Sequence, residues 1–297
     1  KEASFLKQVM GDNCIAIHHI GSTSVPRLIA KPIIDIIMVV KKITEIAPAL
    51  EKLEYKSKGE LNIPFRQYST KESDLVKFHL HVYEEENPEI QLNLLFRNYL
   101  RNSSAAREEY TTLKVDLLNQ KLSHEKGNSR FSGYTLGKDA FIKKVLEQAG
   151  FSDFCIRFCT HHAEWEAYHR IRKEQIFDLT KIQYDPHHPT ITDPDHFHFV
   201  LYKGTKIIGV AHLEFLAVNE AALRPFAIDA PYQNQGIGTK FLVLLEKWLK
   251  LRGKTVIRLH ANKRAQTFYE RSGYKVKTFH GYKPSLSSST IDMGKEL

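Results

Sequence analysis

A short glycine-containing turn between an apolar strand and an amphipathic helix constrains this chain most. The turn follows the apolar run Leu223 to Ile228 and precedes a helical face between Thr239 and Arg252, which Gly253 ends. Its sequence is Gln233-Asn234-Gln235-Gly236-Ile237-Gly238. A turn of this kind leaves unpaired backbone N–H groups at a helix N-terminus, which suits a diphosphate. A side chain at either glycine would hold the phosphates away from the backbone.

Further segments follow the turn in a defined order. The run Val256 to His260 predicts a strand that ends at Asn262, and a short helix carrying Tyr269 comes next. Gly273 ends that helix, and Tyr274 to Phe279 predicts another strand. Without these segments, an ordinary tight turn would explain the glycines equally well. In this order the motifs resemble the GNAT family of acyl-CoA N-acyltransferases, over roughly the second half of the chain.

The resemblance implies a mixed sheet flanked by helices, with acetyl-CoA as cosubstrate. It implies that Tyr269 protonates the leaving thiolate and that Asn262 contacts the pantetheine arm. The CoA diphosphate is then expected on Gln233, Asn234, Gln235, Gly236, Ile237 and Gly238. The backbone N–H of Ile228 or its neighbour could polarise the thioester carbonyl. For Tyr269, the alternative is an aromatic residue of the helix core.

The acceptor amine must lose a proton before it attacks the thioester, so the site needs a base. Strand topology favours two carboxylates, Glu214 first and Asp229 second. A surface or turn carboxylate is the alternative for each of them, and a base that acts through a water is a third arrangement. We also expect Arg170, Arg172 and Lys173, on a helix over Trp165 to Leu179, to face solvent.

The first half opens with a predicted strand over Cys14 to Ile20 and a turn-rich loop over Gly21 to Pro26. A continuous apolar run over Ile33 to Val40 predicts a strand that is buried on both faces. Asp35 lies inside this run, and a buried carboxylate is costly unless it is paired or bound to a metal. Asp35 is therefore a functional candidate, the alternative being a carboxylate that accepts backbone N–H bonds from the loop.

Several blocks of the first half resemble the GrpB-like (UPF0157) family, over about residues 1 to 148. They are His18 to Pro26, Ala30 to Ile36, His79 to Val82, Phe96 to Arg101 and Gly137 to Ile142. The resemblance implies a nucleotidyltransferase-like α/β fold, in which Gly21-Ser22 lies over nucleotide phosphates and Asp35 faces a divalent metal such as Mg²⁺. The expected ligand-binding residues are Gly21, Ser22, Lys31, Asp35, His79, His81 and Arg97.

Two positions depart from that family's pattern. Ile37 stands where the second metal-binding carboxylate is expected, and Asn98 replaces an expected Asp. Because Mg²⁺ takes several oxygen ligands, one carboxylate is too few for two-metal chemistry. His79 and His81 share one strand face, as metal ligands or as hydrogen-bonded histidines that line a pocket. These residues favour nucleotide or anion binding over nucleotidyl transfer, and we name no metal site.

Length, net charge, apolar runs and cysteine content limit the domain count, the partners and the compartment of the chain. A length of 297 residues predicts two domains, 1–149 and 150–297, both of the α/β (α+β) class. The net charge of +9 suits a basic surface, and without an Arg/Lys stripe a nucleic-acid partner is not expected. No apolar run approaches the ~20 residues that span a bilayer. The three cysteines favour a reducing cytoplasm without disulfides. Because Lys1 is the first residue, we expect the chain to be part of a longer product.

The sequence therefore predicts an acetyl-CoA-dependent N-acetyltransferase fused to a GrpB-like domain. Its acceptor is a small-molecule or peptide amine, and the oligomeric state is left open. A protein that joins nucleotidyl transfer to acetyl transfer is one alternative. A non-catalytic CoA-binding scaffold is the other.

Overall fold

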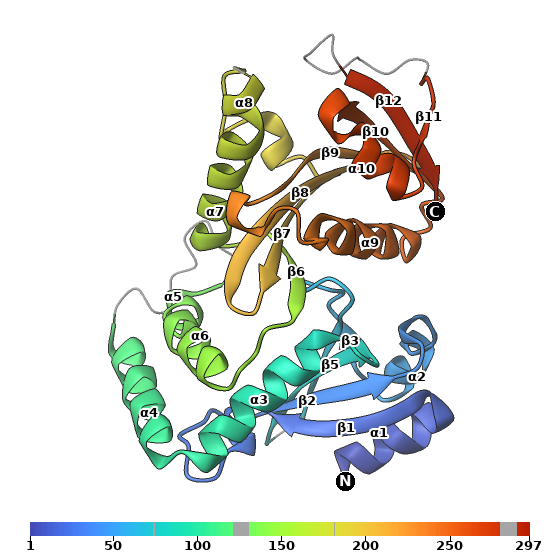
Figure 1. Ribbon diagram of the computed structural model, residues 1–297. Helices are drawn as coiled ribbons and strands as arrows, with labels where there is room; N and C mark the ends of the chain where they lie inside the picture. Colours follow the sequence, from blue (N-terminus) through green and yellow to red (C-terminus); the bar gives the residue numbers. More distant parts are fainter. Residues whose placement is uncertain (74, 121–130, 181, 280–289) are drawn as a thin grey trace. The chain divides into compact units, whose positions relative to one another are not determined.

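The computed structural model describes residues 1–73, 75–120, 131–180, 182–279 and 290–297. The chain divides into two compact units. The first unit comprises residues 1–155 and 203–206, and the second comprises residues 156–202 and 207–297. Each unit is built on its own sheet (Figure 1). No helix of the described residues has the length and apolar character of a membrane span.

The first unit contains a five-stranded sheet in the order β1-β2-β5-β4-β3. The strands are β1 (Cys14–Ile20), β2 (Ile33–Val40), β3 (Lys56–Ser57), β4 (Gln67–Glu72) and β5 (Lys77–Glu84). β2 and β5 pair in parallel, and the other neighbours pair antiparallel. The register puts Asp35 opposite Ile20 on one side and opposite His79 on the other. Three predicted functional side chains therefore meet on one sheet face, since His81 follows His79 by two residues.

Helices cover both faces of this first sheet. The helices of the first unit are α1 (Glu2–Met10), α2 (Ala47–Lys52), α3 (Pro88–Asn102), α4 (Ser104–Asn119), α5 (Gly133–Leu136) and α6 (Asp139–Gln148). α1 and α2 pack on one face of the sheet and α3 on the other, and α4 and α6 pack with α3. Alternation along β2 explains the two layers, because Met38 packs with α1 while Ile37 packs with Leu94 of α3. The Asn87 and Ser103 side chains cap α3 and α4 by accepting backbone N–H bonds.

The second unit contains a seven-stranded sheet in the order β11-β12-β10-β9-β8-β7-β6. Its strands are β6 (Phe154–Phe158), β7 (His196–Lys203), β8 (Lys206–Ala217), β9 (Glu220–Ile228), β10 (Val256–Asn262), β11 (Lys275–Val276) and β12 (Thr290–Glu296). Its helices are α7 (His162–Arg172), α8 (Asp178–Thr180), α9 (Ile237–Lys250) and α10 (Gln266–Arg271). A π-helical turn over Lys173–Phe177 joins α7 to α8.

α7 and α9 cover opposite faces of the second sheet (Figure 1). Neighbouring residues of β7 show this division. Val200 packs with Tyr168 of α7, whereas the ring centroid of Phe199 lies 5.1 Å from that of Trp248 on α9. Trp248 is fully buried. Because α9 has a wide apolar stripe, α9 is the larger of the two helices that cover the sheet.

β9 and β10 pair over only part of their length. Their parallel pairing joins Glu220 to Val256 and ends at Leu223 and Leu259. Beyond that point β9 continues along β8, while β10 continues along β12 to Asn262. The sheet therefore opens between the two strands at the end from which the turn before α9 departs.

Most predicted elements are confirmed, with several differences. The helix predicted over Trp165 to Leu179 is divided into α7, the π-helical turn and α8, and α5 was not predicted. α9 begins at Ile237, two residues before the predicted start, and the strand expected over Tyr274 to Phe279 is only β11. The polar β3 and β4 lack an apolar pattern and were not predicted. Arg172 does not face solvent as expected: it is 8% exposed, because it lies under the rings of Phe177 and Tyr184.

Candidate functional site

Side chains of the loop between β9 and α9 form hydrogen bonds with backbone groups of the loop and of the end of β9. Asp229 accepts the N–H of Ala230 and caps the short helical turn Ala230–Tyr232. Gln233 then reaches back, and its Nε2 donates to the carbonyl of Ile228 at 2.8 Å. Gln235 Nε2 donates to the carbonyl of Pro231 at 3.0 Å. These bonds fix the loop before any ligand binds.

The two glycines of the loop are needed for different reasons. Gly236 has φ of 73°, a left-handed conformation that costs other residues energy, although a β-carbon there would meet no atom within 4 Å. Asn234 also has a positive φ, of 59°. At Gly238 a β-carbon would lie 3.3 Å from the Phe268 ring, so this glycine allows α9 to approach α10.

The start of α9 presents backbone donors. Within the part of the chain that the structure describes, no acceptor contacts the N–H groups of Gly236, Ile237 and Gly238. They belong to the cap and first turn of a 14-residue helix, where the helix dipole adds positive potential. An anion with several oxygens would satisfy these donors.

More backbone donors line the opening between β9 and β10. The N–H of Asp229 bonds to the carbonyl of Ile208, and Gly209 stands opposite Ile228. In an antiparallel pair this pattern makes Ile228 a non-hydrogen-bonded position whose N–H and C=O point away from β8. They point toward β10, which no longer pairs with β9 there. Phe226, two residues earlier, has the same orientation.

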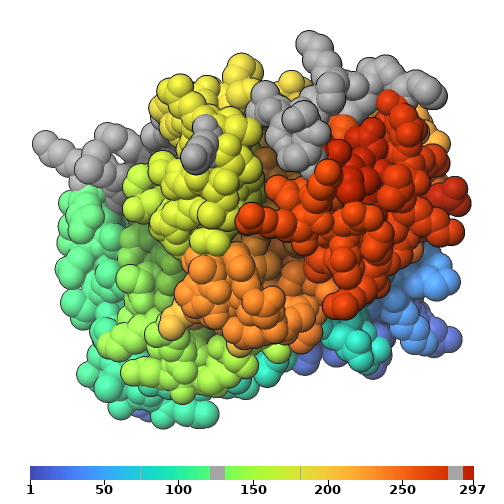
Figure 2. Space-filling model, turned by 45° about the horizontal axis from the view of Figure 1, so that its top comes forward, coloured from blue at the N-terminus to red at the C-terminus, as the bar shows by residue number. Residues whose placement is uncertain are grey.

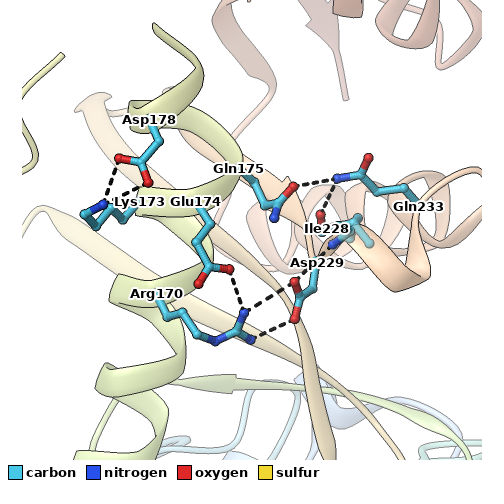
Figure 3. A network of polar contacts seen from close by, with 9 residues as sticks. Arg170, Lys173, Glu174, Gln175, Asp178, Ile228, Asp229 and Gln233 are labelled. Atoms are coloured by element: carbon cyan, nitrogen blue, oxygen red, sulfur yellow. Dashed lines mark hydrogen bonds and ion pairs between the residues drawn. The ribbon is translucent and has the colours of Figure 1, made fainter. Parts of the chain in front are cut away.

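A polar network joins the second unit's first helices to this loop (Figure 3). Arg170 Nη2 lies 2.7 Å from Asp229 Oδ2, and Arg170 Nη1 lies 2.9 Å from Glu174 Oε2. Gln175 accepts from Gln233 Nε2 at 3.1 Å. The hydrogen bond that Arg170 donates to Asp229 is the largest cause that raises the pKa of the Arg170 guanidinium. The space-filling view shows yellow-green atoms of the α7–α8 segment and orange atoms of the segment that includes α9 on the same face of the second unit (Figure 2).

Tyr269 lies on α10 and is buried beside Phe268 and Tyr274, with ring centroids 5.0 and 5.5 Å away. Its hydroxyl has no hydrogen-bond partner in the described residues. Burial raises the pKa of the Tyr269 phenol, so the group keeps its proton at neutral pH. A protonated phenol without a protein acceptor can donate to a leaving group.

Both predicted base carboxylates are paired with arginines. Glu214 lies on β8, and its Oε2 accepts from Arg224 Nε at 2.6 Å. The Glu214 side chain is 20% exposed. Asp229 is paired with Arg170, as described above. The base role of either residue stays a prediction, since each carboxylate is already engaged by a guanidinium.

Asn262 ends β10 at the open side of the sheet. Its side-chain oxygen accepts the N–H of Arg264 at 3.0 Å and caps the turn that leads into α10. The side-chain amide N–H₂ of Asn262 remains as a donor for a ligand. Its contact with a pantetheine arm stays a prediction.

In the first unit, Gly21 and Asp35 lie against each other. A β-carbon at Gly21 would be 2.2 Å from Asp35 Oδ2, so only glycine lets the loop pass this carboxylate. His79 Nδ1 and His81 Nε2 lie 3.4 and 3.8 Å from Asp35 Oδ1. Burial raises the pKa of Asp35, but the hydrogen bonds from His79 and His81 outweigh it and the net shift is downward. Asp35 is thus a carboxylate paired with histidines, as its cost of burial requires.

The other ligand-binding residues predicted for the first unit are Ser22, Lys31 and Arg97, and each makes a contact outside the triad of Asp35, His79 and His81. Arg97 donates to the carbonyl of His19 at 2.9 Å and to the Asn98 side chain, which ties α3 to β1. Ser22 lies at the start of a short turn after Gly21, and its Oγ accepts from Lys114 at 3.3 Å. Lys31 lies over the ring of Tyr134 at 5.1 Å.

The donor set does not fit the Mg²⁺ that the nucleotidyltransferase resemblance implies. Asp35 has no second carboxylate beside it on β2, because Ile37 occupies that position. Among the described residues, no group of three or more His, Cys, Asp or Glu side chains is arranged as a metal site. Hard cations such as Mg²⁺ prefer several oxygen ligands, and this triad offers one carboxylate and two imidazoles.

Sequence reasoning missed five residues of these two sites. Arg170 and Gln175 brace the turn before α9, and nothing in their local sequence marks that role. Lys114 contacts Ser22, the charge of Asp35 acts on Lys138, and Lys138 lies over the Tyr134 ring. For Lys114 a signal was available, because residues 106, 110, 114 and 117 form one helical face and the other three are apolar.

Comparison with known proteins gives each unit a family. Residues 1–148 match the GrpB protein family, and residues 160–274 match the acetyltransferase (GNAT) family. UPF0157 protein YqkA of Bacillus subtilis is 41% identical over 152 residues, which is 50% of this chain and 43% of YqkA. UPF0157 protein BH1888 of Halalkalibacterium halodurans is 32% identical over 152 residues, 50% of this chain and 74% of that protein.

A solved acetyltransferase of the GNAT family from Staphylococcus aureus Mu50 is 18% identical, with a TM-score of 0.41. The match covers 48% of this chain and 99% of that one. This chain spans less than half the length of YqkA. The chain therefore belongs to the GrpB (UPF0157) family through residues 1–148, and residues 160–274 are a domain of the acetyltransferase (GNAT) family.

Proposed function

We propose that the second unit transfers an acetyl group from acetyl-CoA to an amine. The observation that carries this proposal is the set of unaccepted N–H groups at Gly236, Ile237 and Gly238. They lie at the open end of the β9–β10 pairing, which is the geometry that a diphosphate with a long attached arm would fill. Membership of residues 160–274 in the acetyltransferase family supports the same reading.

In this proposal the loop from Gln233 to Gly238 holds the diphosphate, and the open strand edges hold the arm. The N–H of Ile228 points into the opening, where it polarises the thioester carbonyl and stabilises the tetrahedral oxyanion. The amine nitrogen attacks the carbonyl carbon, the carbon–sulfur bond breaks, and the Tyr269 phenol gives its proton to the leaving thiolate. Asn262 contributes its amide N–H₂ to the arm.

A base must take the proton from the amine, and Glu214 remains the first candidate, with Asp229 second. Each is held by an arginine on the same unit, Arg224 and Arg170 respectively. An incoming cationic amine would compete with the guanidinium for the carboxylate, which would free the base only when the acceptor is present. We propose a small-molecule or peptide amine as the acceptor class.

Calorimetry with acetyl-CoA, followed by a thiol-release assay over a panel of amines, tests the proposal. Saturable binding and amine-dependent release of CoA are expected. Binding without turnover on any amine would favour a non-catalytic CoA-binding scaffold. The absence of acetyl-CoA binding would remove the proposed function of the second unit altogether.

For the first unit we propose a nucleotide- or anion-binding role rather than nucleotidyl transfer. The basis is Asp35, which is engaged by two histidines and lacks a second carboxylate. Turnover of Mg-ATP that disappears in Asp35→Asn would favour the alternative of a protein with two transferase activities. The three cysteines are buried and free, which suits the reducing cytoplasm that we propose as its compartment.

A further inference from the structure

Three lysines of the first unit gather beside the turn that follows β1. Lys31 and Lys138 lie over the Tyr134 ring, at 5.1 and 4.6 Å from its centroid. Lys114 of α4 donates to Ser22 Oγ at 3.3 Å and to the carbonyl of Ile29. Their side chains come from a loop, from α4 and from the start of α6, so the tertiary structure alone brings them together.

Lys138 interacts electrostatically with both Lys114 and Lys31. Burial is the main cause that lowers the pKa of Lys114 to about 8, and the charge of Lys138 adds to it. Burial also lowers the pKa of Lys138, with Asp35 opposing the shift and Lys31 adding to it. Lysines within electrostatic reach of each other repel, and the repulsion destabilises the site unless an anion offsets it.

None of the three has an ion pair with a carboxylate anywhere in the described ranges. Lys114 is only 5% exposed, and it donates to an uncharged hydroxyl and an uncharged carbonyl. A buried ammonium without a counter-ion is costly. The Lys114 ammonium also lies over the uncharged Tyr110 ring, 5.0 Å from its centroid, so its known contacts are all with uncharged groups. Asp35, the carboxylate whose charge acts on Lys138, already has His79 and His81 beside it.

We propose that Ser22, Lys31, Lys114, Lys138 and Tyr134 form a binding site for a phosphate ester with two or more negative charges. In this site lysine charge takes the place of the Mg²⁺ for which the Asp35 region lacks ligands. The inference deepens the anion-binding role proposed for the first unit and rests on it. The lysines hold the phosphate as point charges, and the Ser22 and Tyr134 hydroxyls supply directed donors.

Calorimetry of the full chain with inorganic pyrophosphate tests the site, with inorganic phosphate and ATP as parallel probes. Saturable binding in buffer with EDTA is expected, unchanged on addition of Mg²⁺. Binding of ATP but not pyrophosphate would still support the site if Lys138→Met abolishes it, and would assign the ligand as a nucleotide. A requirement for Mg²⁺ would overturn the metal-independent site.

Variants separate the lysine site from general effects of charge. Lys138→Met and Lys114→Met should each weaken pyrophosphate binding at least tenfold. Lys143→Met is the matched control, because Lys143 lies on α6, which begins directly after Lys138, but pairs with Asp139 at 2.8 Å. It should change the affinity less than twofold. If Lys114→Met fails to fold by circular dichroism, Lys138→Met decides alone, because Lys138 is less buried than Lys114.

Asp35→Asn gives the sharpest contrast. It removes a negative charge from the neighbourhood of Lys138, so pyrophosphate binding should tighten, by about threefold or more. If a metal bound to Asp35 held the phosphate, the same variant would abolish binding. If both lysine variants still bind pyrophosphate or ATP as tightly as the wild type, the proposed lysine site is wrong. The anion-binding role of the first unit would then still stand. Binding of none of the probes would remove both, without touching acetyl transfer by the second unit.

Discussion

Arg170 of α7 and Asp229 at the end of β9 are 2.7 Å apart from Nη2 to Oδ2, and this pair ties the first helix of the second unit to the loop before α9. The Arg170 side chain is 44% exposed, whereas that of Asp229 is 13% exposed. Solvent therefore reaches the cation more than the carboxylate. A pair of this kind stabilises the fold by about 1 kcal/mol or less, so its main effect is to position the loop before α9 relative to α7.

The pair separates two roles for Asp229. If Asp229 only braces the loop, Arg170→Met and Asp229→Asn should each weaken acetyl-CoA binding by a few fold, and the double variant should be no worse than either single one. If Asp229 is the base, Asp229→Asn should lower kcat at least a hundredfold while Arg170→Met leaves it nearly intact. Steady-state kinetics of the three variants with a saturating amine would decide. Glu214→Gln, assayed alongside, tests the first-ranked base in the same way.

Gly236→Ala should weaken acetyl-CoA binding, because the added β-carbon strains the left-handed backbone that presents the loop N–H groups. Gly253→Ala is a matched control. Its φ is 71°, and a β-carbon there also meets no atom within 4 Å, but it lies at the far end of α9. Both changes should cost about 1 to 2 kcal/mol of stability, measured by chemical denaturation. Gly236→Glu should abolish binding by charge repulsion. Equal loss of binding in both alanine variants would contradict the loop assignment.

Tyr269→Phe should lower kcat by about tenfold to a hundredfold while the Kd for acetyl-CoA stays within twofold. The phenol's pKa is raised by burial, so its ionisation should produce no alkaline loss of kcat up to pH 10 in the wild type. Because the folded pKa exceeds the unfolded one, stability from this group is present below the unfolded pKa and declines only at higher pH. Unchanged turnover in Tyr269→Phe would remove this residue as the acid.

The second unit should lose stability as the pH falls from about 6.5 to about 4. His198 Nε2 donates to the carbonyl of Thr190, and its Nδ1 accepts from Tyr168, which in turn accepts from Arg172. Burial is the main cause that lowers the pKa of His198 to about 4, although the Thr190 bond opposes it, and the Arg172, His196 and His169 charges add to the lowering. His212 beside it has a pKa that burial also lowers.

A depressed folded pKa means that stability is full above the unfolded value of about 6.5 and is lost as the pH falls toward the folded value. At 1.36 kcal/mol per pKa unit, the loss from His198 is on the order of 3 kcal/mol. Tryptophan fluorescence reports the unfolding of the second unit, because the chain's two tryptophans, Trp165 and Trp248, both lie in that unit. His198→Gln should flatten the pH dependence, and the control His162→Gln, at a side chain 92% exposed, should not. A pH-independent melting temperature between 4 and 6.5 would refute the prediction.

The sequence alone determined the elements and the order of the motifs. β1 and β2 were predicted to the residue, and the strand, turn and helix around Gly236 and Gly238 were predicted to within a few residues. These features are local, because apolar periodicity and backbone sterics act within a few residues of the chain. The polar β3 and β4 had no such signal, since the pairing of β4 with β5 and of β3 with β4, rather than their own pattern, holds them in place.

The tertiary structure alone decided which side chains meet. Arg170 reaches Asp229 across 59 residues, and Lys114 reaches Ser22 across 92. No local pattern records such pairs, because they follow from how helices pack on a sheet and from which face of each helix is buried. The state of the candidate carboxylates was decided in the same way, since Glu214 and Asp229 are each held by an arginine, as Asp35 is by two histidines, from another element.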